Sequence, residues 1–128
     1  MSLAYWCVLA CAVLPYMWVA VAKVRPGYNN RNPRAWAGKS ENYLVQRAYA
    51  AHLNAFEAFA PFAAGVVLAQ LAGVAAPTIN TLACAFVVFR TLHGVLYLAD
   101  KPLLRSLAWL GGITCLVALL VLAAWRAG

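Results

Sequence analysis

Long apolar stretches, separated by short breaks that contain proline, glycine or polar residues, set the pattern of this sequence. Apolar residues dominate 2–23, 40–73, 77–98 and 103–125. As a helix at about 1.5 Å per residue, each run is long enough to cross roughly 30 Å of hydrocarbon. The pattern predicts an all-α fold in which residues 1–128 form one membrane domain, with four spans joined as hairpins in a transmembrane bundle.

Composition agrees with a membrane protein and argues against two other classes. Of the 128 residues, 66% are hydrophobic and 10% are charged, and the mean hydropathy is +0.77. Too few polar side chains remain to cover a soluble domain. The net charge of +7 does not indicate nucleic-acid binding, because the basic residues gather in one connector. We therefore expect membrane lipid, and no nucleic acid, around the chain.

The connector after the first span predicts the orientation in the membrane. It contains five basic residues, which are Lys23, Arg25, Arg31, Arg34 and Lys39. Basic loops stay on the cytoplasmic side, where anionic lipids attract them, whereas the turn near Pro77 carries no charge. We expect both termini on the non-cytoplasmic side and residues 24–41 as a surface loop, with Ser40 or Asn42 capping the second span.

The first span is interpreted as a retained helix, with a cleaved signal peptide as the alternative. It lacks a basic n-region, and Pro15 interrupts its apolar core. Its Cys7 and Cys11, like Cys84 and Cys115 in later spans, have neither CxxC nor metal-ligand spacing. We expect no metal site.

Polar side chains interrupt the second span at helical spacing. At about 100° per residue, Arg47 and Asn54 lie roughly 20° apart around a helix and Glu57 lies about 80° from Arg47, so the three share one face. His52 lies on another side, and Pro61 is expected to kink the helix where the polar face ends. An ionisable side chain at bilayer depth costs at least about 2.5–3.5 kcal/mol. This face therefore predicts a functional site.

A second polar cluster lies near the end of the third span. Arg90, His93 and Tyr97 fall at i, i+3 and i+7 along one stripe, and Arg105 lies one turn inside the fourth span. With hairpin connectors, both clusters occupy the cytoplasmic half of the membrane. A structural alternative remains open, in which Glu57 forms a buried ion pair with Arg47 or Arg90 that fixes helix register.

The two clusters together resemble a known family. The spacing RAxxAHxNxxExxxPF, from Arg47 to Phe62, is similar to the second-helix signature of the MAPEG family, the membrane-associated proteins in eicosanoid and glutathione metabolism. Arg90, Tyr97 and Arg105 resemble ligands on that family's third and fourth helices. The resemblance covers nearly the whole chain and implies a bacterial-type member, placed in the inner membrane.

The resemblance implies a homotrimer that holds glutathione as co-substrate between neighbouring subunits and acts on a lipophilic small-molecule substrate. By this resemblance, Glu57 meets the glutathione ammonium, and Arg47 and Arg90 meet carboxylates or pair with Glu57. Asn54, Tyr97 and His93 would bind glutathione by hydrogen bonds. Arg105 is the expected catalytic residue, because a fixed cation favours a thiolate.

Three positions depart from the family pattern. Ala50 stands where many members have arginine, His93 stands where a tyrosine is common, and Arg105 is displaced by one residue. The set of Arg, Glu, Asn and Tyr residues supports the leading hypothesis, a glutathione-dependent transferase or peroxidase that acts on electrophiles or hydroperoxides. The departures at Ala50 and Arg105 support the alternative, a non-catalytic member that binds a lipid or a partner membrane protein. A four-span cation exporter is disfavoured, since the arginines around Glu57 would repel a cationic substrate.

Overall fold

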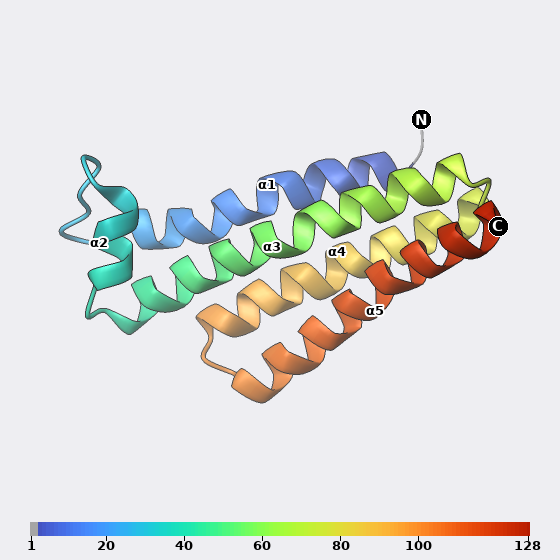
Figure 1. The fold of residues 1–128 in the computed structure, drawn as a ribbon. Helices are drawn as coiled ribbons and strands as arrows, with labels where there is room; N and C mark the ends of the chain where they lie inside the picture. The colour runs from blue at the N-terminus through green and yellow to red at the C-terminus, as the bar shows by residue number, and fades with distance from the viewer. Residues whose placement is uncertain (1–2) are drawn as a thin grey trace.

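The structure, a computed structural model, describes residues 3–128, and within that range all regular elements are α-helices. They are α1 Leu3–Lys23, α2 Pro33–Lys39, α3 Tyr43–Leu71, α4 Ala76–Leu98 and α5 Pro102–Ala127. The four long helices lie side by side as an up-and-down bundle (Figure 1), and each is long and apolar enough to cross a membrane. The predicted four-helix membrane bundle is confirmed. Ser2, where the first span was expected to begin, lies outside the described residues.

The expectation of a continuous loop over residues 24–41 was wrong, because α2 lies within this connector. Pro33 opens α2 at a position where its fixed φ suits the first turn and its missing N–H costs nothing. Ala37 of α2 is buried in a small apolar cluster with Ala22 of α1 and Val45 of α3. The short helix therefore packs against the end of the bundle that joins α1 to α3 (Figure 1).

Capping sets the two ends of α3. Of the two predicted caps, Ser40 and Asn42, the structure uses Asn42. Its side-chain oxygen accepts hydrogen bonds from the backbone N–H of Leu44 at 2.9 Å and of Val45 at 3.4 Å. The helix begins at Tyr43 for this reason, slightly later than expected. It ends at Leu71 because Gly73 adopts a φ of +74°, which reverses the chain toward α4.

The main core lies between α1, α3, α4 and α5, in the half of the bundle near the α3–α4 turn. Phe62 and Phe86 are fully buried and stack with ring centroids 4.0 Å apart. Gly65 of α3 brings that helix close to α5, because a Cβ there would lie 3.2 Å from Leu119. Stacking and close helix approach together anchor α3 and α4 just beyond their polar clusters.

Tight packing also sets the position of α1 against α4 beside the second polar cluster. Trp18 of α1 is buried and lies over Gly94 of α4, where an added Cβ would overlap the indole ring. His93 is the neighbour of this glycine in sequence. The register between α1 and α4 is therefore specified next to a residue of the predicted site.

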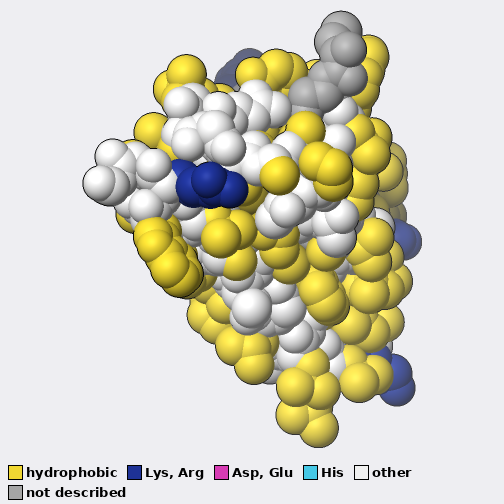
Figure 2. All heavy atoms as spheres, turned by 90° about the vertical axis from the view of Figure 1, so that its right-hand side faces the viewer, with side chains coloured by type: hydrophobic (Ala, Val, Ile, Leu, Met, Phe, Trp, Pro, Cys, Tyr) yellow, Lys and Arg dark blue, Asp and Glu magenta, His cyan; other side chains and the backbone are white. Residues whose placement is uncertain are grey.

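The surface of the bundle suits a lipid environment. Large apolar side chains are exposed on the long helices, including Leu9, Val13, Val88, Leu110 and Val121. Figure 2 views the end of the bundle that carries the α3–α4 turn and the C-terminus, and it shows mainly hydrophobic side chains and backbone with scattered Lys and Arg. The protein is an integral, multi-pass membrane protein.

Candidate functional site

Arg90 and Asn54 connect the two polar clusters. Arg90 of α4 is only 4% exposed, and its Nη2 donates to the Oδ1 of Asn54 on α3 across 2.6 Å. Gly112 of α5 leaves room for the arginine stem, since a Cβ there would lie 3.3 Å from Arg90 Cδ. A buried guanidinium therefore lies between three helices, with a neutral amide as its hydrogen-bond partner.

A small cavity opens beside this pair. Its volume is about 200 Å³, and residues of α3, α4 and α5 line it. These residues are Asn54, His93, Tyr97, Arg105, Ser106 and Trp109. The structure thus brings together residues that the sequence places up to two helices apart.

Arg105 lies against the aromatic face of Tyr97. Its guanidinium carbon Cζ is 4.3 Å from the centre of the tyrosine ring, a close cation–π contact. A guanidinium stacked in this way has its planar orientation fixed, while its N–H groups remain available at its edges. The displacement of Arg105 by one residue in the sequence therefore does not keep it away from the cavity.

His93 has a buried nitrogen without a partner. The side chain is 3% exposed, and its Nδ1 has no hydrogen-bond partner among the described residues. Its ring contacts Tyr97 edge-on, with centroids 5.6 Å apart, because the two residues are four apart on α4. Buried polar atoms in native proteins are nearly always paired, so the Nδ1 of this cavity-lining residue is a candidate hydrogen-bond partner for a bound ligand.

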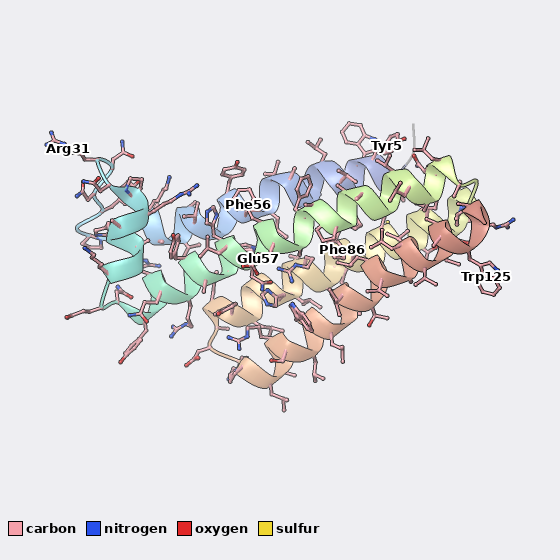
Figure 3. All side chains as sticks on the ribbon, in the orientation of Figure 1. Tyr5, Arg31, Phe56, Glu57, Phe86 and Trp125 are labelled. Atoms are coloured by element: carbon pink, nitrogen blue, oxygen red, sulfur yellow. The ribbon has the colours of Figure 1, made fainter. Side chains whose placement is uncertain are left out.

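Glu57 and Arg47 do not line this cavity. Glu57 is exposed about midway along α3 (Figure 3), and no ion pair joins it to Arg47 or Arg90 within residues 3–128. Arg47 is partly buried, and its Nε has no partner among those residues. Among the described residues, the ion pair that the sequence left open as an alternative is therefore absent from the single protomer. The Glu57 side chain is exposed, although its charge still acts on Arg90.

A second cavity of about 200 Å³ lies on the other side of α3, between α1, α2 and α3. Its wall is largely aromatic, with Lys23 and Arg34 also among the lining residues. His52 forms part of this wall and donates from Nδ1 to the backbone carbonyl of Pro15 across 2.8 Å. Phe56 (Figure 3), one turn further along α3, packs edge-on against both His52 and Tyr16 of α1.

Sequence reasoning missed the contributions of Ser106 and Trp109, and it did not place His52 in a cavity. Ser106 and Trp109 lie one and four residues after Arg105, so the spacing around that arginine was the available signal for them. His52 carried no such signal, because its partner is a backbone carbonyl. Within residues 3–128, no group of three or more His, Cys, Asp or Glu side chains could hold a metal ion.

Comparison with known proteins identifies the family. The MAPEG family model matches residues 3–125, which contain α1, α3, α4, nearly all of α5 and both polar clusters. Neither a curated protein nor a solved structure shows significant similarity to the chain. The family match covers nearly the whole sequence and agrees with the four-helix bundle and its intramembrane polar residues. The chain therefore belongs to the MAPEG family, which includes glutathione transferases and peroxidases as well as non-catalytic members.

Proposed function

We propose that this protein is a glutathione-dependent membrane transferase or peroxidase that acts on lipophilic electrophiles or hydroperoxides. The observation that carries the proposal is the position of Arg105, held on the face of Tyr97 beside the cavity that His93 and Asn54 also line. A fixed cation next to a thiol favours the thiolate, which is the nucleophilic form. The cavity thus suits a reactive sulfur.

The chemistry needs little from the protein beyond an oriented thiolate. With an electrophile, the sulfur forms a bond to carbon, and the leaving group departs or the adduct takes up a proton. With a hydroperoxide, two glutathione molecules yield the alcohol, water and glutathione disulfide. Both second substrates partition into the bilayer, and the exposed apolar surface of the long helices is in contact with that phase.

The remaining groups of glutathione are assigned to charged residues outside the small cavity. Glu57 would meet the ammonium, and Arg47 would meet a carboxylate. Because Glu57 faces outward on a membrane span, its exposure supports a partner from beyond the protomer. A cyclic homotrimer would supply such a partner for Glu57, since each interface in a ring joins two different faces of neighbouring subunits.

The two cavities described above fit such an interface. His52 and Asn54 are two residues apart on α3, which places them roughly 200° apart around the helix. The cavity that His52 lines, here called the aromatic cavity, and the cavity that Asn54 and Arg105 line, here called the Arg105 cavity, therefore lie on different sides of α3. Two halves of a repeated interface would be arranged in this way. In the proposed trimer, Lys23 and Arg34 of one subunit approach the glutathione held by the next.

The test is a titration of the purified protein in detergent with glutathione. We expect calorimetric binding at or below millimolar ligand, a rise in thiolate absorbance at neutral pH, and conjugation of chlorodinitrobenzene or reduction of cumene hydroperoxide. S-methylglutathione serves as the control ligand, because it binds without forming a thiolate. Absence of binding at millimolar glutathione would contradict the proposal and favour the non-catalytic alternative, in which the protein binds a lipid or another membrane protein.

A further inference from the structure

The hydrogen bond between Arg90 and Asn54 determines whether the oxygen or the nitrogen of the Asn54 amide remains available to bind another group. A guanidinium has five N–H donors and no acceptor. The amide must therefore turn its oxygen to Arg90, as the 2.6 Å contact to Oδ1 shows. Both N–H donors of the Asn54 amide then remain for another partner, and Asn54 lines the Arg105 cavity.

The other polar groups around this cavity are also donors, or can act as donors. Arg105 has only donors, the indole N–H of Trp109 only donates, and the hydroxyls of Tyr97 and Ser106 can donate. Among residues 3–128, no carboxylate lines the cavity. The nearby guanidinium of Arg90 is buried, and its hydrogen bond goes to an amide instead of an acid. A cavity with this lining is complementary to an anion.

We infer that Asn54 donates a hydrogen bond from its amide nitrogen to the thiolate sulfur of glutathione, and that Arg90 is the positioning residue that turns the amide this way. This inference rests on the proposed function. In it, Arg90 does not bind a glutathione carboxylate, in contrast to the role that the family resemblance implies. The thiol S–H bond breaks on binding, its proton passes to water, and the sulfur anion is held between Arg105 and Asn54.

The depth of the site suits the reacting sulfur of glutathione. Asn54 lies eleven residues after Tyr43, the first residue of α3, or about 16 Å along the helix at 1.5 Å per residue. A sulfur that attacks lipophilic substrates has to lie within the membrane, where those substrates partition. The cavity of about 200 Å³ holds one end of the tripeptide, with the rest of the molecule outside it.

The test uses Asn54→Asp, which keeps an oxygen for Arg90 and replaces the donating nitrogen with a second oxygen. We expect an unchanged melting temperature and a loss of thiolate absorbance at neutral pH by about tenfold or more. S-methylglutathione should bind with nearly unchanged affinity, because it presents no sulfur anion. Gln46→Glu is the matched control, since it makes the same amide-to-acid change on an exposed part of α3, and it should leave the thiolate signal intact.

Variants of Arg90 separate positioning from direct binding. Arg90→Lys retains a donor for Oδ1 and should restore most of the thiolate signal that Arg90→Met loses. If Asn54→Asp weakens glutathione and S-methylglutathione equally, Asn54 binds another part of the ligand and the inference is wrong. If Asn54→Asp forms as much thiolate as the wild type, it is wrong as well. If wild-type protein binds no glutathione, the proposed function itself fails, which is a distinguishable result.

Discussion

His52 donates from Nδ1 to the backbone carbonyl of Pro15 across 2.8 Å and so joins α3 to α1. A carbonyl oxygen only accepts, so Nδ1 must carry the proton, and in the neutral imidazole Nε2 is then the acceptor. His52 is buried against Tyr16 and Phe56. The histidine therefore serves first as a contact between helices.

Replacing His52 should lower stability by a predictable amount. His52→Ala removes one hydrogen bond and buried ring contacts, which we expect to cost about 1–3 kcal/mol of the free energy of unfolding. His52→Asn retains an N–H near the position of Nδ1 and should recover part of the loss. Thermal unfolding in detergent measures both. A wild-type melting temperature for His52→Ala would show that this contact adds little.

Glu57→Gln tests the assigned ammonium ligand. The variant keeps the side-chain volume and removes the charge, so glutathione affinity should fall by roughly 1.5–3 kcal/mol, the range for a hydrogen bond to a charged group. Isothermal titration gives the change, and Glu41→Gln, an exposed carboxylate in the connector, is the matched control. A loss of thermal stability with unchanged glutathione affinity would instead indicate an ion pair with a neighbouring subunit.

Arg105→Ala should affect the thiol rather than the binding of the tripeptide. A free thiol has a pKa of about 8.5, and a fixed cation lowers it, so removal of Arg105 should raise the pKa of bound glutathione toward that value. Turnover at pH 7 should fall and partly recover as the pH rises above about 8.5. Thiolate absorbance against pH measures the shift. Arg126→Ala, at the other end of α5, should leave the pH profile unchanged, and an unchanged profile for Arg105→Ala would remove its catalytic role.

The protein should assemble as a homotrimer, because the outward-facing Glu57 needs a partner within the membrane. Native mass spectrometry in detergent should give a species of three chains. Glu57→Gln should not change this number if the carboxylate binds a ligand rather than a subunit. A stable monomer or dimer would remove the intersubunit site from the proposal.

Both termini should face away from the cytoplasm. The α3–α4 turn lies at the same end of the bundle as the start of α1 and the end of α5, while the basic connector lies at the other end (Figure 1). In a variant without its native cysteines, Ala75→Cys should react with an impermeant maleimide in intact cells, and Asn30→Cys should react only after lysis. Labelling of Asn30→Cys from outside would show that the topology is the inverse of the predicted one and that the site is not in the cytoplasmic half of the membrane.

Local sequence properties predicted the spans and several of the residues that line the cavity beside Arg105. Hydropathy over some twenty residues depends on no partner, so the four membrane helices could be recognised without a structure. Helical spacing likewise placed His93 and Tyr97 on one stripe, and the family resemblance added Arg105. Asn42 could be recognised as a candidate cap because its hydrogen bonds are local.

The tertiary structure decided which of these residues meet. Arg90 pairs with Asn54 and not with Glu57, and His52 bonds to a backbone carbonyl on α1. These choices depend on the register and approach of neighbouring helices, which are set by contacts such as Trp18 on Gly94. A one-residue change in register rotates a helical side chain by about 100°. Spacing within one helix therefore determined which side chains share a face, while packing between helices determined their partners.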